Sequence, residues 1–404
     1  MSGKYPARVG VTDWIGAGTS GRLIDAPYIR ELPLSEKSLA SALKDGGYKT
    51  WHVGKWHLGK SDFYPERHGF DVNIAGSDWG HPFSGYFSPY GMETMSDGPD
   101  GEYLTDRLTD EAIKLIKNHD CGNSPFFLNF WHYAVHEPIQ SPEHLIEKYE
   151  KKAKEMGIDK IDPFQEGDFF PCDHLKHLKI KRRIIQSSPS YAAMVENLDT
   201  NIGKLLDVLD ECGISDSTAI FFTSDNGGLA TAGMSPTSNA PLSEGKGWMY
   251  EGGVREPLIV KWPNVIKPGS VCEIPVTSPD FYPTILEMAN LPKIPEQHID
   301  GVSMTNLLKG GNKIDRDAIY WHYPHYGNQG GTPGASMRMG DYKLIEFFED
   351  NRLELYDLKN DLEENFNIAE KNKELTEKMY GMLKTWQIEV QAKFPAVNPE
   401  YKTK

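Results

Sequence analysis

The stretch that most limits how this chain can fold is a short apolar run followed at once by an acid, an amide and two glycines. Residues 220–228 read Ile-Phe-Phe-Thr-Ser-Asp-Asn-Gly-Gly. This pattern predicts a buried strand that ends at Asp225 and Asn226, at the edge where open α/β sheets carry their sites. Asp and Asn supply hard oxygen ligands, which Ca²⁺ and Mg²⁺ prefer. The same residues are also common in a plain strand-to-loop turn, so this pattern alone leaves both interpretations open.

Composition and charge narrow the class of protein. The chain has 404 residues, of which 39% are hydrophobic and 11% aromatic, which is typical of a globular protein with a large core. With 43 basic and 58 acidic residues its net charge is −15, which argues against a nucleic-acid partner. An anionic substrate would therefore have to be held by a few local cations. No apolar run approaches the roughly 20 residues that span a bilayer, so we predict no membrane span.

Helical and strand patterns alternate along most of the chain, which predicts an α/β fold with a mostly parallel sheet flanked by helices. We expect helices at 35–45 (capped by Ser35), 103–118, 191–209 and 280–290, and strands at 48–54, 125–131, 220–223 and 258–262. Residues 145–190 are charged and irregular, and we interpret them as an insertion. Four short strands and a helix at about 370–392 follow residue 312. The sequence therefore predicts a large domain at 1–311 and a smaller C-terminal α+β subdomain, with an antiparallel sheet, at 312–404.

Polar residues follow several of the predicted strands. Six of them are candidates for a site: Lys55, His57, His136, Asp225, Asn226 and Lys246. Each alone has an ordinary explanation as a solvated turn or a loop-capping group. Together they offer lysines and histidines that donate hydrogen bonds to a tetrahedral oxyanion, and ligands for a cation that withdraws charge from it. The combination favours hydrolysis of a sulfate or phosphate ester.

The order of the motifs resembles that of the type I sulfatases in the alkaline-phosphatase-like superfamily, over nearly the whole chain. The similar segments are Ser2–Gly10, Gly54–Gly59, Val135–Pro138, Phe222–Gly228, Gly245–Pro257 and Leu355–Asp361. The first resembles the segment just after the family's nucleophile motif, the second its Gly-Lys-Trp-His-Leu-Gly signature, and the last its C-terminal subdomain. The ordered set is highly specific, and it identifies 1–311 as the expected catalytic domain.

The resemblance also implies roles for the six residues. Asp225 and Asn226 would bind Ca²⁺, with Mg²⁺ less expected, and Lys55, His136 and Lys246 would contact the sulfate oxygens. His57 would hydrogen-bond the nucleophile, which in this family is a formylglycine hydrate made by a maturation enzyme from Cys or Ser in a C/S-x-P-S/A-x-R motif. Family members are usually periplasmic or secreted, although no signal peptide is evident here.

The nucleophile motif itself is not found in this sequence. None of the four cysteines is followed by the required Pro and Arg. Ser187–Ala193 is similar, but it lacks the arginine that the motif requires, and we interpret this segment as the cap of a long helix. The motif and the paired acids of a first strand are expected upstream of Met1. We therefore expect an N-terminally truncated sulfatase that hydrolyses sulfate esters poorly or not at all.

Aromatic and histidine side chains suggest a sulfated small molecule or glycan as the partner. The loop at 79–90 carries aromatics that could stack on sugar rings, and His322 and His325 could reach the substrate from the C-terminal subdomain, although aromatic loops are as often simply packed. Two alternatives remain open. One is a phosphoesterase or phosphonate hydrolase of the same superfamily, and the other is an inactive pseudoenzyme that binds an anion or a glycan.

Overall fold

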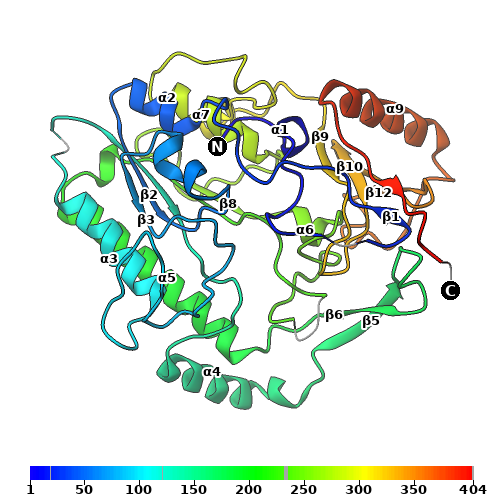
Figure 1. Ribbon diagram of the computed structural model, residues 1–404, viewed down its shortest axis with the longest axis horizontal. Coiled ribbons are helices and arrows are strands. Elements are labelled where there is room, and N and C mark those ends of the chain that lie inside the picture. The colour runs from blue at the N-terminus through cyan, green and yellow to red at the C-terminus, as the bar shows by residue number, and fades with distance from the viewer. Residues whose placement is uncertain (19, 121, 232–234, 403–404) are drawn as a thin grey trace.

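A three-stranded parallel sheet forms the centre of the N-terminal half (Figure 1). The computed structural model describes residues 1–18, 20–120, 122–231 and 235–402. Strand β2 (Lys49–Gly54) lies between β3 (Val72–Ile74) and β4 (Phe126–Trp131) and pairs with both in parallel. Because parallel strands end at the same edge, the residues after β2 and β4 are brought together.

Helices cover both faces of this sheet. Helices α3 (Leu104–Lys117) and α5 (Pro189–Glu211) run side by side on one face, and α2 (Leu39–Asp45) and α7 (Phe281–Met288) pack on the other (Figure 1). Helix α2 begins later than predicted, because its cap is Ser38, whose Oγ accepts a hydrogen bond from the Ser41 N–H at 3.0 Å. The predicted cap at Ser35 is therefore wrong.

Strand β7 (Ile220–Thr223), which precedes Asp225, pairs with β8 (Leu258–Lys261) in an antiparallel ribbon of its own. The prediction of a buried strand is wrong, since Phe222 is 42% exposed and Thr223 is exposed. The physical reason is that β7 has a strand neighbour on only one edge among the described residues, so no second strand shields its side chains from solvent along the other edge.

The segment interpreted as an irregular insertion contains regular structure. Helix α4 (Glu143–Met156) packs along α5, and β5 (Phe164–Phe169) forms a hairpin with β6 (Lys179–Arg183) that lies at the lower right of Figure 1. Only Ala153 of α4 is fully buried. A charged helix with so narrow a buried face gives a weak apolar period, which explains why the sequence pattern missed it.

A four-stranded antiparallel sheet forms the C-terminal part, in the order β12–β11–β10–β9. Its strands are β9 (Ile319–Tyr323), β10 (Gly334–Met339), β11 (Tyr342–Phe347) and β12 (Leu353–Asp357). Helix α9 (Lys373–Glu389) covers one face, where Met337, Leu344 and Leu383 are buried together (Figure 1). The predicted fold class, a parallel sheet flanked by helices with a C-terminal antiparallel sheet, is confirmed. The division at residue 311 stays a prediction.

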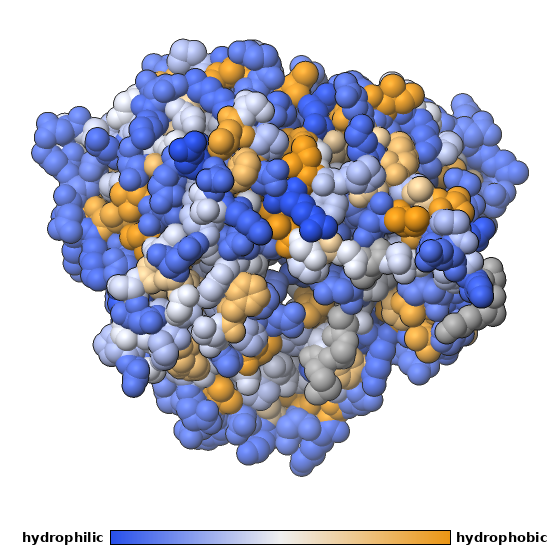
Figure 2. Space-filling model, viewed as in Figure 1, coloured by the Kyte–Doolittle hydropathy of each residue, from blue (hydrophilic) through white to orange (hydrophobic). Residues whose placement is uncertain are grey.

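Short elements complete the described chain. They are α1 (Pro6–Val9), β1 (Leu23–Ile24), which pairs with β13 (Ala396–Val397), α6 (Glu251–Val254) and α8 (Thr305–Leu308). Figure 2 shows that the face turned to the viewer is hollowed near its centre. Within the described ranges, no helix has the length and apolar character needed to cross a bilayer.

Candidate functional site

The ends of β2 and β4 place Lys55 at the edge of the parallel sheet. The Lys55 N–H donates a hydrogen bond to the Trp131 carbonyl at 2.7 Å. Gly54, just before it, has φ = 100°, and a Cβ at this position would overlap the same carbonyl. Burial lowers the pKa of the Lys55 amine; Asp225 acts in the opposite direction and Lys246 in the same one. The amine is therefore within electrostatic reach of both.

Gly54→Ala is expected to destabilise the fold by more than about 1 kcal/mol, because alanine meets both an unfavourable φ and the Trp131 carbonyl. Gly47→Ala is a matched control, since Gly47 also has a positive φ (89°) but has no atom within 4 Å of the added Cβ. Urea denaturation of the two variants checks this. Equal losses in both would show that the contact with the carbonyl contributes nothing.

Backbone contacts between two glycine-rich turns place Lys246 beside Asp225. The Lys246 N–H donates to the Gly228 carbonyl at 3.1 Å, and the Gly227 N–H donates to the Gly253 carbonyl at 3.1 Å. A Cβ at Gly227 would overlap the carbonyl of Gly252, so this close approach requires glycine. Burial lowers the pKa of the Lys246 amine, and Asp225 partly opposes this shift.

His136 and Lys246 form a direct pair, with 2.9 Å between His136 Nε2 and Lys246 Nζ. Burial, followed by the charge of Lys246, lowers the pKa of His136 to about 4, so the ring is neutral at pH 7. His136 Nδ1 lies 3.0 Å from the Glu137 carbonyl, which fixes the proton on Nδ1 as a donor to that oxygen. Nε2 therefore accepts a hydrogen bond from the Lys246 ammonium.

His57 is held at the same edge by the loop that follows α1. Its Nε2–H donates to the Ile15 carbonyl at 3.2 Å, which leaves Nδ1 as the unprotonated nitrogen of the neutral ring. Burial, and then the charge of Lys55, lowers the pKa of His57. The structure thus brings Lys55, His57, His136 and Lys246 into one group around the Asp225 turn.

Asp225 and Asn226 have the chemistry of Ca²⁺ ligands but supply only part of a coordination shell. Asp225 is exposed, and Asn226 donates from Nδ2 to the Gly227 carbonyl at 2.9 Å, which leaves its Oδ1 free to act as a ligand. Ca²⁺ takes about six to eight oxygens, so two side chains need further donors. In the described part of the chain there is no group of three or more His, Cys, Asp or Glu placed to hold a metal ion.

The structure does not bring His322 into this group. His322 is buried in β9, and its Nε2–H donates a hydrogen bond to the Lys393 carbonyl at 2.8 Å. Its ring packs against those of Phe348 and Phe394. These contacts favour a structural role, and the predicted contact of His322 with substrate gains no support.

His325 has a different environment, which is also fully buried. Its Nε2 lies 2.9 Å from the Thr12 hydroxyl, and its Nδ1 lies 3.6 Å from Asp25 and 3.9 Å from Asp13. Asp13 in turn accepts a hydrogen bond from the Tyr323 hydroxyl at 3.0 Å. His325 therefore joins the 12–25 segment to the C-terminal sheet, and its predicted contact with substrate also stays without support.

The sequence did not identify three residues that lie next to this group of candidate residues. The ring of His81 stacks on that of His136 with 6.1 Å between centroids. Burial, reinforced by Asp225, raises the pKa of Glu256 to about 7. Ile15 contributes only its carbonyl, which no side-chain pattern reveals. Glu256, in contrast, lies in the Gly245–Pro257 motif, so the sequence could have indicated it as a candidate.

The structure shows the contacts of the loop at 79–90 and of the Ser187–Ala193 segment. Tyr86 and Tyr90 are fully buried, and the Tyr86 hydroxyl donates to the His136 carbonyl at 2.9 Å, so these rings support the site rather than face a sugar. Phe83 is exposed beside His81. Ser188 Oγ accepts a hydrogen bond from the Tyr191 N–H at the start of α5, which confirms that this segment is a helix cap.

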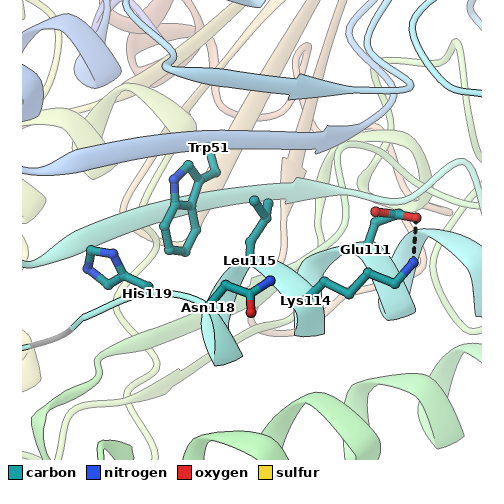
Figure 3. Close-up of a pocket in the computed structure, with 6 residues that line it drawn as sticks. All are labelled: Trp51, Glu111, Lys114, Leu115, Asn118 and His119. Atoms are coloured by element: carbon teal, nitrogen blue, oxygen red, sulfur yellow. Dashed lines mark hydrogen bonds and ion pairs between the residues drawn. The ribbon is translucent and has the colours of Figure 1, made fainter.

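A separate hollow of about 420 Å³ lies between β2 and the end of α3. It is lined by Trp51, Glu111, Lys114, Leu115, Asn118 and His119. Figure 3 shows the Lys114 ammonium paired with the Glu111 carboxylate, and the distance between them is 2.8 Å. None of the six candidate residues contributes to its lining, so this hollow is not the candidate site.

Comparison with known proteins decides the family. A model of the family described as Sulfatase matches residues 1–291. The chain belongs to the sulfatase family. A second model, described as N-sulphoglucosamine sulphohydrolase, C-terminal, matches residues 244–391 of this sulfatase.

Named relatives of this sulfatase are longer than the chain itself. It is 36% identical over 310 residues to a sulfatase from Formosa agariphila, a match that covers 71% of this chain and 50% of the relative. It is 29% identical over 335 residues to N-acetylgalactosamine-6-sulfatase from Mus musculus, which covers 77% of this chain and 55% of the relative. The chain thus spans about half the length of these two relatives.

Solved structures agree with the fold. The crystal structure of Ps i-CgsB in complex with k-i-k-neocarrahexaose is 25% identical to this sulfatase, with a TM-score of 0.73, and the match covers 100% of this chain and 82% of that one. The structure of BT4656 in complex with its substrate D-glucosamine-2-N,6-O-disulfate is 22% identical, with a TM-score of 0.71, and the match covers 96% and 86% of the two chains. The second likeness speaks for the alkaline-phosphatase-like fold alone.

Proposed function

We propose that Lys55, His136 and Lys246 bind the sulfate group of a sulfated carbohydrate, and that the chain acts in the hydrolysis of such esters. The observation that carries this proposal is the pair of part-buried amines. Among the residues that the structure describes, neither the Lys55 nor the Lys246 ammonium forms an ion pair with a carboxylate. Two such cations at one sheet edge, in a chain of net charge −15, are suited to an anionic group such as a sulfate ester, whose single negative charge is shared by three oxygens.

Each of the three residues has a different role in binding that anion. Lys55 and Lys246 approach from different segments and donate to separate oxygens, so the anion is fixed in orientation as well as in charge. His136 accepts from Lys246 in the free site, which holds the flexible lysine side chain toward the Asp225 turn. A bound anion raises the pKa of His136 and favours its protonation, which turns Nε2 into a further donor.

His57 is placed for proton transfer close to the bound ester. Its Nε2–H is fixed on the Ile15 carbonyl, so the unprotonated Nδ1 is the nitrogen that accepts a proton or a hydrogen bond. Ca²⁺ held by Asp225 and Asn226 would withdraw charge from the sulfate oxygens. The family's formylglycine nucleophile would have to come from outside these 404 residues, together with the maturation enzyme that makes it, since the sequence contains no C/S-x-P-S/A-x-R motif.

The proposal is tested by calorimetric titration of the chain with N-acetylgalactosamine 6-sulfate, N-acetylgalactosamine 6-phosphate and unsulfated N-acetylgalactosamine. We expect binding of the sulfated sugar, weaker binding of the phosphorylated one and none of the plain sugar. Tighter binding of the phosphate would favour the phosphoesterase alternative, and equal binding of all three would contradict the sulfate site. Sulfate release, measured in the same samples, separates an active enzyme from a pseudoenzyme that only binds.

Sulfate binding is expected to tighten as the pH falls from about 9.5 to 6.5. In the free site the pKa values of Lys55, Lys246 and His136 are lowered, mainly by burial, and a bound dianion raises them, so binding is coupled to proton uptake. The free protein has the opposite dependence. A lysine with a lowered pKa binds fewer protons in the folded state than in the unfolded state. The free energy of unfolding therefore rises as the pH increases from its folded pKa to its unfolded pKa.

Thermal denaturation with and without sodium sulfate checks this pH dependence. The increase in melting temperature caused by sulfate should be larger at pH 6.5 than at pH 9.5. Sodium chloride at equal ionic strength is the control. An increase that is the same at both pH values would contradict the coupling to protons.

A further inference from the structure

The loop at 79–83 packs directly against two of the candidate histidines. Gly80 lies against the ring of His57, since a Cβ at Gly80 would be 2.7 Å from His57 Cε1. His81 stacks on the ring of His136, with 6.1 Å between the ring centroids and 13° between the ring planes. Burial is the main cause of the lowered pKa values of His57 and His136, and His81 is a smaller cause of both shifts. The loop therefore borders the candidate site.

Phe83 belongs to the same loop and is 62% exposed. Its ring centroid lies 4.3 Å from that of His81 and 5.0 Å from that of Trp79, and both neighbours meet it edge-on. The ring of His81 thus packs against both Phe83 and His136. An exposed apolar ring is therefore one side chain away from the proposed sulfate site.

Hydrogen bonds fix the turn that carries Phe83. The Gly85 N–H donates to the Pro82 carbonyl at 2.9 Å, and the Tyr86 N–H donates to Gln140 Oε1 at 2.9 Å. Pro82 and Tyr86 are buried on the two sides of the exposed residue. A ring held in this way is pre-organised to bind, because little backbone or side-chain freedom is lost when a ligand covers it.

The groups around Phe83 are suited to a sugar ring. A pyranose has apolar C–H faces and a polar edge of hydroxyl groups. Phe83 offers one apolar surface, and the imidazole of His81 and the exposed Ser84 hydroxyl supply polar groups next to it. The apolar ring of an aryl sulfate would instead be expected in a pocket lined mainly by hydrophobic side chains.

We propose that the Phe83 ring stacks on the C–H face of the sugar that carries the sulfate group, and that it determines specificity for sulfated carbohydrate. This inference rests on the proposed function, because it places the sulfate of the same sugar at Lys55, His136 and Lys246. Phe83 binds the sugar ring and has no part in the hydrolysis. Its contribution should therefore appear with a sulfated sugar and be absent with the sulfate ion alone.

The test is calorimetric titration of the unaltered chain and of Phe83→Ala with N-acetylgalactosamine 6-sulfate and, separately, with sodium sulfate. We expect Phe83→Ala to weaken binding of the sulfated sugar by about tenfold, because a large apolar contact is lost. The dissociation constant of sodium sulfate should stay the same. Phe83→Trp should retain the binding of the sulfated sugar, since tryptophan keeps an aromatic face at this position.

Proton NMR of the sugar gives a second, structural readout. The ring current of Phe83 should shift the C–H protons of one sugar face upfield when the sulfated sugar binds. Phe83→Ala should abolish this shift at saturating sugar, and Phe83→Trp should retain it. A bound sugar without any upfield shift in the unaltered chain would overturn the stacking.

Phe366→Ala is the matched control, since Phe366 is also exposed, at 71%, but lies in the C-terminal part. It should change the binding of neither ligand. Full binding of the sulfated sugar by Phe83→Ala, with sulfate bound normally, would overturn the inference and leave the proposed function intact. Equal losses with both ligands would also overturn it, because Phe83 would then act only through His81 and His136.

Two further outcomes separate the remaining possibilities. If Phe83→Ala weakens binding of 4-nitrophenyl sulfate more than binding of the sulfated sugar, the ring recognises an aryl group and the inference is wrong. If the unaltered chain binds neither sodium sulfate nor the sulfated sugar, the proposed function itself is contradicted, and the inference that rests on it falls as well.

Discussion

Lys246→Ala is expected to weaken the binding of sulfate and of sulfated sugar by about 10- to 100-fold. The variant loses one of the two ammonium groups that we propose bind the anion, and a charge-assisted hydrogen bond contributes about 1.5–3 kcal/mol. It also leaves His136 Nε2 without the donor that lies 2.9 Å away. Isothermal titration with sodium sulfate, and then with N-acetylgalactosamine 6-sulfate, measures the change in dissociation constant.

Lys151→Ala is the matched control for this loss of charge. Lys151 lies on α4 with 80% of its side chain exposed, and its nearest carboxylate, on Glu155, is 3.9 Å away. This control changes the net charge by the same amount, so it isolates the general electrostatic effect from the local contact. Unchanged binding in Lys246→Ala would remove Lys246 from the sulfate site. An equal loss in both variants would attribute the effect to net charge.

The parts of the site that the sequence predicted are those where a local pattern and the geometry coincide. Gly54 precedes Lys55 because the end of β2 approaches the Trp131 carbonyl too closely for a side chain. Gly227 follows Asn226 because that turn packs against the Gly252 carbonyl, and Gly228 comes next because the Thr237 side chain lies too close for a Cβ. The partners of these glycines lie further along the chain, but each contact requires glycine at one position, so it leaves a readable trace in the sequence.

The parts that the sequence did not predict depend on distant packing. Strand β7 has the composition of a buried strand, but its exposure depends on which strands lie beside it. His322 belongs to a strand that the sequence predicted, yet the contact of its ring with Lys393 comes from 71 residues further along the chain. A strand pattern indicates that residues alternate between two faces, and only the tertiary structure shows what each face meets.

A buried charge network joins the Lys246 segment to the C-terminal sheet. Lys343 of β11 is fully buried, and its Nζ lies 3.0 Å from Glu251 and 3.2 Å from Glu364. The Glu251 N–H also donates to Glu364 at 2.7 Å. Burial raises the pKa of Glu364 to about 7, although Lys343 opposes this shift. Lys343 thus bridges Glu364 and Glu251, which lies five residues beyond Lys246, and Arg255 and Arg338 also pair with Glu251.

Lys343→Met is expected to lower the free energy of unfolding by about 3–5 kcal/mol, because it leaves Glu364 buried without its cation and removes one of the three cations that pair with Glu251. The loss should be larger at pH 8.5 than at pH 6. A carboxyl whose folded pKa is raised is protonated, and therefore less costly to bury, below that pKa, and its penalty grows as the pH rises from the unfolded value through the folded one. Urea denaturation at both pH values measures the effect.

Two further variants decide whether the network is the cause. Lys359→Met changes an exposed lysine between β12 and α9 and should leave the unfolding midpoint unchanged. Adding Glu364→Gln to Lys343→Met should restore part of the loss at pH 8.5 and little at pH 6, where Glu364 is already protonated in the single variant. A loss in Lys343→Met that is independent of pH, and that Glu364→Gln does not reduce, would show that the methionine disturbs packing alone. In that case the coupling of the Lys246 segment to the C-terminal sheet would have to depend on its other contacts, such as that of Tyr250 with Glu354 at 2.8 Å.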